Sequence, residues 1–360
     1  MNTNVKLKFP EADDFFSELQ LHVKQTVTTD VHKKSVRLLW LKLFFYFLLF
    51  SASYASLYVF NHEKLFTLVI NYILIGLSGI LLAFNASHDA AHRTFSRRPW
   101  VNELIYTITF NLQGVNGHLW KIRHKSSHHL FPNVDGCDAD IDDNPMIRLS
   151  PTQPRYWWHR YQHLYATGLY FLYTLHWIFI KDFIYLNKKD LANLRDLKHS
   201  RSLAIRLISW KAFYFVYMLA LPVYFADSSW SAVLIAFFIM HCTVSIFFVL
   251  TLIISHLCME TKFPVADENG LLPYGYHQHQ LEVSMDYHPT SRLANWIFGG
   301  FNSHSAHHLF PHLPHTLYAK ITPLIQTASK KYNYAYNELS LLAGICSHYR
   351  YLRKLGKTLN

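Results

Sequence analysis

The uncharged stretch at residues 231–255, SAVLIAFFIMHCTVSIFFVLTLIIS, decides the class of fold. It contains 25 residues without Lys, Arg, Asp or Glu, and about 20 apolar residues suffice for a helix to cross a bilayer. Residues 65–87 and 43–60 form uncharged stretches of 23 and 18 residues. A shorter one at 212–226 reaches spanning length if Lys211 extends its amine to the membrane interface. The sequence therefore predicts four transmembrane helices.

The composition agrees with a membrane protein. Of 360 residues, 51% are hydrophobic, 16% are aromatic and only 16% are charged, whereas soluble domains have about 25% charged residues. These values exclude a disordered chain, and four cysteines are too few for a disulfide scaffold. The net charge is +11, from 34 Lys and Arg against 23 Asp and Glu. The basic residues are not gathered in one arm or stripe, so we expect no binding of nucleic acid.

The short connections and flanking charges of the four spans predict their topology. Only residues 61–64 and 227–230 separate the members of each pair, so the spans form two hairpins, 38–87 and 207–255. Segment 88–206 carries sixteen Lys and Arg, and the positive-inside rule places it in the cytosol together with both chain ends. We expect no cleaved export signal. A bacterial inner membrane is the expected location.

We expect one domain over residues 1–360, with an all-α integral membrane fold. Its four-helix stem would carry a helical cytosolic cap made of segments 88–206 and 256–360. Two softer apolar stretches in the cap, 104–117 and 165–186, are interrupted by polar residues and are expected at the membrane interface.

The N-terminal segment 1–36 is predicted to be cytosolic. Residues 13–28 place Phe16, Leu19 and Val23 at helical spacing between charges, which predicts an amphipathic helix. The pattern is equally compatible with packing on the body and with lying on the membrane surface.

Three histidine clusters fall in the predicted cytosolic segments. In a helix, residues i, i+3 and i+4 share a face, so each cluster would aim two or three imidazoles in one direction. Because all three lie on one side of the membrane, they can converge on one site. The clusters are His88-Asp-Ala-Ala-His92, His124-Lys-Ser-Ser-His128-His129 and His304-Ser-Ala-His307-His308.

Eight imidazoles exceed what one metal ion needs. Zinc takes four ligands, whereas eight donors divide between two metals that keep open positions. The apolar stem suggests an inert hydrocarbon substrate, and breaking an unactivated C–H bond requires an oxygen-derived oxidant. We therefore favour two irons with O2 as co-substrate. His312 and His315, after the third cluster, are expected either behind its ligands or in a surface turn.

The clusters and their surroundings resemble the membrane fatty acid desaturases, and more narrowly the acyl-lipid and linoleoyl-CoA-type branch. The likeness covers roughly residues 70–335, and the motifs are highly specific in combination. They are His88-Asp89-Ala-Ala-His92, Trp120-Lys-Ile-Arg-His124 with His128-His129, Asn133-Val-Asp-Gly136 with Asp138-Ala-Asp140, His279-Gln280, Trp296, Gly299-Gly300-Phe-Asn302 and His307-His308-Leu309-Phe310-Pro311.

The resemblance implies a non-haem di-iron centre held by the boxes and by one more histidine after the last span. The implied ligands are His88, His92, His124, His128, His129, His304, His307, His308 and His256. Asp89, Asp138 and Asp140 are candidates to accept hydrogen bonds from these rings, with a solvated acidic loop as the alternative. No substrate-binding residue can be assigned beyond an apolar channel lined by aromatics such as Trp120.

Three positions differ from related branches. His304 stands where the branch that works between an existing double bond and the carboxyl end usually has Gln, which leaves the regiochemistry open. Leu252 stands where the stearoyl-type branch has a ligating Asn, so no such ligand is expected. The chain has no His-Pro-Gly-Gly haem motif, so electrons are expected from a separate protein.

The resemblance implies an O2-dependent desaturase that introduces a cis double bond into a long-chain acyl group. The acyl carrier would be CoA, a carrier protein or a glycerolipid. The net charge favours an acidic electron donor, such as a ferredoxin or a cytochrome-b5-type protein, and also anionic membrane lipids. A di-iron lipid or carotenoid hydroxylase or ketolase with the same boxes stays open. A histidine-lined metal transporter is a remote alternative, because its ligands should lie near the bilayer midplane.

Overall fold

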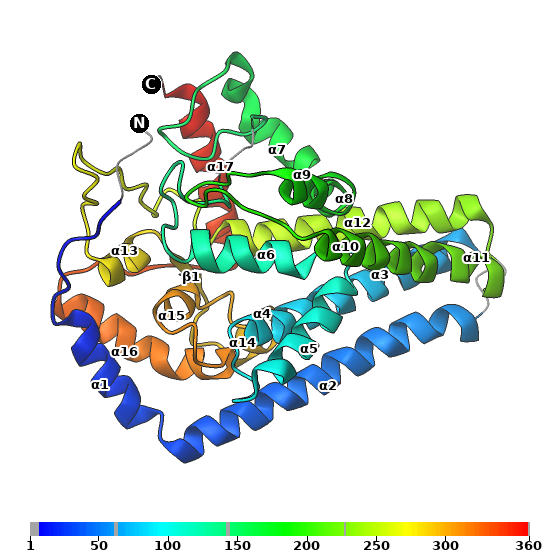
Figure 1. Cartoon of the computed structure of the whole chain (residues 1–360), viewed down its shortest axis with the longest axis horizontal. Coiled ribbons are helices and arrows are strands. Elements are labelled where there is room, and N and C mark those ends of the chain that lie inside the picture. The colour runs from blue at the N-terminus through cyan, green and yellow to red at the C-terminus, as the bar shows by residue number, and fades with distance from the viewer. Residues whose placement is uncertain (1–6, 61–63, 142–144, 227, 359–360) are drawn as a thin grey trace.

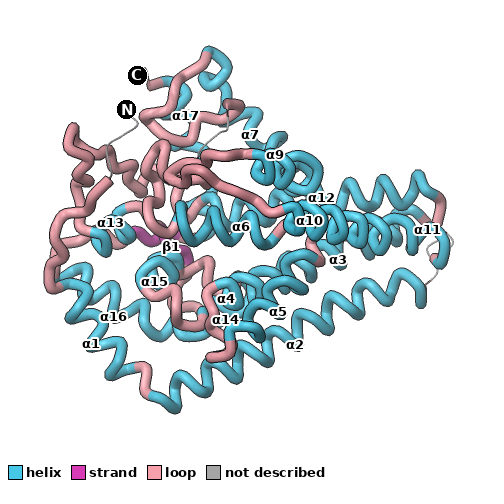
Figure 2. The backbone as a smooth tube through the Cα atoms, in the orientation of Figure 1, coloured by secondary structure: helices cyan, strands magenta, loops and turns pink. Residues whose placement is uncertain are grey.

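The computed structural model describes residues 7–60, 64–141, 145–226 and 228–358. Figure 1 shows a narrow stem of long helices that widens into a cap of shorter helices and loops. The described chain is mostly helical, and Figure 2 shows that its loops gather in the cap.

Within the described residues, four helices are long and apolar enough to cross a membrane, and they match the four predicted spans. Ser200 and Ser229 begin the last two, where their hydroxyl oxygens accept hydrogen bonds from the amides of Leu203 and Ala232, both at 3.2 Å. The spans are α2 (Thr29–Val59); Leu65–Ala91, which comprises α3 (Leu65–Leu82), η1 (Ala83–Ser87) and α4 (His88–Ala91); Arg201–Phe225, which comprises α10 (Arg201–Phe215), η5 (Val216–Ala220) and α11 (Leu221–Phe225); and α12 (Trp230–Ile253).

Helix α3 forms the centre of the stem, because it packs against both α2 and α12. Its close approach to α12 depends on Gly76. A Cβ atom at this position would lie 2.5 Å from Cγ of Met240 and 2.6 Å from Cγ2 of Val244. Only glycine therefore allows the two helices to meet here without displacing side chains.

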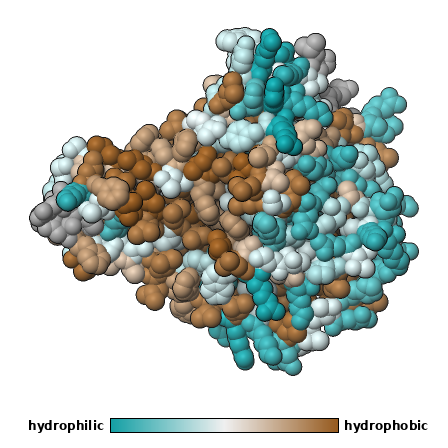
Figure 3. Space-filling model, turned by 180° about the vertical axis from the view of Figure 1, so that it is seen from behind, coloured by the Kyte–Doolittle hydropathy of each residue, from teal (hydrophilic) through white to brown (hydrophobic). Residues whose placement is uncertain are grey.

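The outer surface of the stem is apolar. Phe44, Leu48, Phe66 and Phe238 are 50–73% exposed on three different helices. Figure 3 shows hydrophobic residues gathered over the stem and hydrophilic residues over the cap. Exposure of this apolar surface to water would be unfavourable, so lipid is the environment that fits it.

The place of Lys211 beside the third uncharged stretch suggested that its amine extends to the membrane interface. In the structure, Lys211 of α10 does not do so. It is buried, and its Nζ lies 2.8 Å from Oδ2 of Asp182. The same amine donates to the carbonyl oxygens of Gly114 at 3.0 Å and Ile178 at 2.6 Å. The cation therefore fastens a membrane helix to the cap instead of reaching solvent.

Replacing Lys211 with methionine is expected to destabilise the protein by about 3–5 kcal/mol. Removing one partner of a buried ion pair leaves the other charge uncompensated. Unfolding by SDS in mixed micelles measures the loss. A Lys211→Met/Asp182→Leu double variant should recover part of it. A single variant as stable as the wild type would contradict this account of the pair.

The cap contains one feature that departs from the predicted all-α fold. Strands β1 (Met285–Tyr287) and β2 (Asn337–Leu339) form a parallel pair, with Asp286 opposite Glu338. Three residues are too few to show alternation in a sequence. The cap helices are α5 (Pro99–Asn111), α6 (Gly117–Arg123), η2 (His124–His128), η3 (Trp157–Tyr161), α7 (Gln162–Phe171), α8 (Tyr173–His176), η4 (Trp177–Lys181), α9 (Asp182–Asn187), α13 (Tyr276–Glu282), α14 (Arg292–Phe298), α15 (His304–Leu309), η6 (His315–Leu317), α16 (Tyr318–Lys331) and α17 (Leu341–Lys357).

The N-terminal amphipathic helix packs on the body of the protein. It is α1 (Phe15–Thr26), and it lies along α16, as Figure 1 shows. Phe15, Leu19 and Val23 are buried in this contact. The structure thus favours the packing interpretation of this segment.

Candidate metal centre

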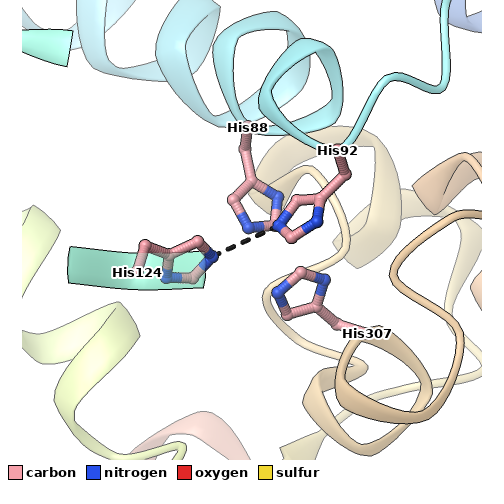
Figure 4. Close-up of side chains that lie close together, drawn as sticks. All are labelled: His88, His92, His124 and His307. Carbon is pink, nitrogen blue, oxygen red and sulfur yellow. Dashed lines mark hydrogen bonds between the residues drawn. The ribbon is translucent and has the colours of Figure 1, made fainter. Parts of the chain in front are cut away.

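Two groups of four histidines lie at the end of the stem. Within each group, one ring nitrogen from every member lies within 4.8 Å of the others. Figure 4 shows the rings of the first group pointing toward one another. The first histidine group is His88, His92, His124 and His307, and the second histidine group is His128, His256, His304 and His308.

His129 lies between the two groups. Its Nε2 is 3.0 Å from Nε2 of His124 in the first group. Its ring stacks on that of His308 in the second group, with centroids 4.6 Å apart. The structure therefore brings together all nine histidines that the resemblance names as ligands, including His256 from the turn after α12.

The distribution of the clusters between the groups differs from the expectation. His88 and His92 of the first cluster belong to one group, whereas the second and third clusters each contribute rings to both groups. His124 and His128 are the first and last residues of the π-helical turn η2, and fall into different groups. Their rings are nevertheless neighbours, stacked with centroids 5.7 Å apart, so this cluster spans the boundary between the two groups. In the third cluster, His307 belongs to the first group, whereas His304 and His308 belong to the second.

Hydrogen bonds to Nδ1 orient the rings of the second group. The Nδ1 atom of His128 lies 3.1 Å from Asp138 Oδ1, that of His256 lies 2.9 Å from the Val283 carbonyl, and that of His308 lies 2.8 Å from Gln280 Oε1. Acceptors at these places put the proton on Nδ1 and leave Nε2 as an electron-pair donor.

The ring nitrogens that remain fit metal ions. Nε2 of His304 lies 2.7 Å from Nε2 of His256 and 3.1 Å from Nε2 of His308. The Nε2 atoms of His256 and His308 carry lone pairs, and a metal cation between the three rings would satisfy them, as would a proton on His304. In the described part of the chain, Nε2 of His88 and of His307 is buried without a hydrogen-bond partner. Imidazole clusters of this kind suit iron, copper, zinc or nickel.

Burial keeps most of these imidazoles neutral, which is the form that binds metal. Burial lowers the pKa of His256 to about 3, and it holds the pKa values of His304 and His307 well below the usual range. His128 differs: burial alone would lower its pKa, but the carboxylates of Asp138 and Asp140 outweigh burial and raise it.

The three aspartates predicted beside the ligands have different roles. Asp138 is buried and accepts from His128, as proposed. Asp140 lies 3.6 Å from Nδ1 of His128 and pairs with Nε of Arg123 at 3.1 Å. Asp89 bonds to none of the nine histidines among the described residues. It accepts instead from Nδ1 of His315, at 2.5 Å.

His315 therefore lies behind the ligands, whereas His312 is exposed. Nε2 of His315 is 2.5 Å from the amine of Lys42, which is fully buried in α2. A chain of polar contacts thus runs from the membrane helix α2 through His315 to the residue after His88. In the acidic loop that begins at Asp135, the carboxylate of Asp135 accepts a hydrogen bond from the hydroxyl of Thr152 at 2.6 Å. Residues 142–143 of this loop lie outside the described residues.

Asp286 and Tyr318 support the third cluster without any motif that marks them in the sequence, and Gln280 is marked only as part of a motif. The hydroxyl of Tyr318 lies 3.3 Å from Nδ1 of His307. Asp286 is fully buried and accepts from the amide of Ser305 at 2.8 Å and from the hydroxyl of Tyr336 at 2.6 Å. It thereby fixes the start of α15, which carries the third cluster. Its only signal in the sequence is a lone acid between Met285 and Tyr287.

Asp286 should give the stability a pH dependence of its own. Burial raises its pKa to about 6, against about 3.9 in an unfolded chain. Between pH 4 and 6 the folded state binds more protons at this residue, so the stability that depends on it falls as pH rises. We expect the free energy of unfolding of Asp286→Asn, relative to that of the wild type, to improve by about 2 kcal/mol from pH 4 to pH 7. SDS unfolding across this range tests it, and a constant difference would contradict it.

A cavity of about 810 Å3 adjoins both histidine groups. It is mainly apolar and includes Trp120, Phe84 and Phe248 in its wall, and Trp120 also stacks on His124 with centroids 4.3 Å apart. Both His241 and Ile253 of α12 line it. Their separation of twelve residues corresponds to roughly 18 Å of helix. The cavity therefore suits a long apolar ligand that passes beside the histidines.

Comparisons with known proteins agree with this arrangement. A family model described as fatty acid desaturase matches residues 64–340. An sn-1 linoleoyl-lipid 6-desaturase of Arthrospira platensis is 28% identical over 299 residues, which cover 82% of this chain and 80% of the relative. An acyl-lipid (8-3)-desaturase B of Dictyostelium discoideum is 28% identical over 364 residues, covering 97% of this chain and 77% of the relative.

Proposed function

Since the chain belongs to the fatty acid desaturase family and is therefore an oxidoreductase of lipid metabolism, we propose that it is an O2-dependent di-iron desaturase of long-chain acyl groups. The observation that carries the proposal is that histidines of both groups line one mainly apolar cavity. A pair of irons held there would supply the redox chemistry that removal of hydrogen from unactivated methylenes requires.

The proposed reaction converts –CH2–CH2– to cis –CH=CH–, with O2, two electrons and two protons giving two molecules of water. The residues of the chain position the reactants. The nine histidines would hold the irons, and Asp138, Gln280 and the Val283 carbonyl fix the rings in place. The apolar wall excludes water and extends the acyl chain past the centre, with Trp120 beside His124.

A glycerolipid is the acyl carrier that we favour over CoA or a carrier protein. The two relatives described above are named as lipid desaturases. The cavity also has an exposed apolar rim, which includes Leu172, Phe179 and Ile180, and this rim would face lipid. Product analysis decides the bond position, because His304 leaves the regiochemistry open.

For the membrane, we propose one domain over residues 1–360, with the stem as two hairpins and with the cap and both ends in the cytosol. The short connections, the apolar stem and the sixteen Lys and Arg of segment 88–206 support this topology. A bacterial inner membrane fits it. Electrons would come from an acidic carrier, a ferredoxin or a cytochrome-b5-type protein.

Expression in a host with a compatible electron donor, followed by gas chromatography–mass spectrometry of total lipids, tests the proposal. We expect new unsaturated acyl chains that disappear in the His307→Ala/His308→Ala variant. Hydroxylated or keto products would instead identify a hydroxylase or ketolase with the same centre. A purified protein without tightly bound iron would contradict the proposal and reopen the transporter alternative.

A further inference from the structure

His92 is the one proposed ligand that is not buried. The other eight of the nine histidines are at most 8% exposed, whereas His92 is partly exposed at the end of α4. Electron transfer between proteins weakens steeply with distance. An external protein would therefore come closest to the proposed metals at this ring.

Cations surround His92. Arg93 follows it and is exposed, and the amine of Lys125 lies 3.4 Å from the carbonyl oxygen of Ala91. Lys121 and Lys125 lie four residues apart in the continuous helical stretch of α6 and η2, which places them on one face. One carboxylate, that of Glu103, pairs with Lys121 at 2.6 Å. The surface around the exposed ligand thus carries a net positive charge.

The segment that follows Arg93 connects this surface to a cationic groove. The groove has a volume of about 390 Å3 and contains no acidic residue among those described in its wall. Its cations come from α1, from α2 and from the loop before α5. They are Lys24, Lys33 and Arg97, and the imidazoles of His32 and His312 lie beside them.

We propose that Arg93, Lys121 and Lys125, together with this groove, form the docking surface of an acidic one-electron carrier protein. The inference rests on the proposed function, because only a redox centre behind His92 needs such a partner. Each docking would oxidise the carrier by one electron and reduce the centre by one. Two dockings supply the two electrons of one desaturation, and the protons come from water.

The surface does not overlap the proposed acyl site. The acyl cavity contains none of these six cations in its wall. Carrier and acyl lipid can therefore be bound at the same time.

Charge reversal tests the proposal in the full-length, iron-loaded protein. Lys24→Glu/Lys33→Glu/Arg97→Glu and Arg93→Glu are compared with Arg353→Glu/Lys354→Glu/Lys357→Glu, which reverses three exposed cations of α17. The probe is a reduced plant-type ferredoxin at low salt. Single turnover with dithionite measures the desaturase without any carrier, so failure of the proposed function is recognised separately.

We expect kcat/KM for ferredoxin to fall at least about 10-fold in the first two variants and to depend less on salt, with dithionite turnover unchanged. The α17 variant should behave like the wild type. Two results would overturn the proposal: carrier kinetics unaffected by the reversals, or an equal loss in the α17 variant. An equal loss with dithionite would also overturn it, because these residues would then act on the centre itself. Binding to anionic vesicles that weakens while ferredoxin kinetics do not would reassign the surface to lipid.

Discussion

Replacing His307 with alanine is expected to abolish formation of unsaturated product, with a loss of more than about 100-fold, and to lower the iron content of the purified protein. Substitution of residues that only orient metal ligands typically costs 10–100-fold, so removal of a ligand should cost more. His307 is fully buried, and its Nε2 atom has no partner in the described residues other than the proposed metal. Metal analysis and product yield measure the two effects.

His348→Ala is the matched control for this substitution. His348 is also fully buried, but its Nδ1 bonds to the Leu257 carbonyl at 2.7 Å and its Nε2 to the hydroxyl of Tyr170 at 2.8 Å. It lies outside both histidine groups, so the variant should keep its iron. If His307→Ala retained full iron and activity, or if both variants lost iron equally, His307 would not be a ligand.

The second large effect is expected from Asp138. Asp138→Asn should lower kcat by 10–100-fold and weaken iron binding, with little change in KM for the acyl substrate. The carboxylate accepts from Nδ1 of His128 and from the amides of Asn133 and Asp140, both at 2.9 Å. An amide in its place weakens the contact that fixes the ring of His128.

Asp135→Asn serves as the control from the same loop. Asp135 bonds to the hydroxyl of Thr152 and to no histidine among the described residues. Its substitution should leave kcat and iron binding near the wild-type values. Equal activity of the two variants, or a change confined to KM, would show that Asp138 does not act through His128.

The sequence predicted the stem and the histidines well because both signals are local. An uncharged stretch of 25 residues has one favourable environment, and imidazoles three or four residues apart are close neighbours in any helical turn. The sequence could not predict to which of the two groups each ring belongs. This assignment depends on how η2 and α15 pack against segments distant in sequence.

The supports of the site were the least predictable part. Gln280, Asp286 and Tyr318 act through contacts with other elements, 11 to 28 residues away in the sequence, and each looks ordinary in its own segment. Asp89 shows the converse. Its place beside His88 suggested a bond to a ligand, yet the fold turns it toward His315, 226 positions away. Lys211 likewise found a buried carboxylate where local hydropathy suggested an interface.

The central claim is that two histidine groups hold two irons, and anomalous X-ray diffraction at the iron edge tests it most directly. We predict two iron peaks per chain, one among the Nε2 atoms of His88, His92, His124 and His307 and the other among those of His128, His256, His304 and His308. A single peak, a peak outside these groups, or a signal at the zinc edge alone would contradict the account.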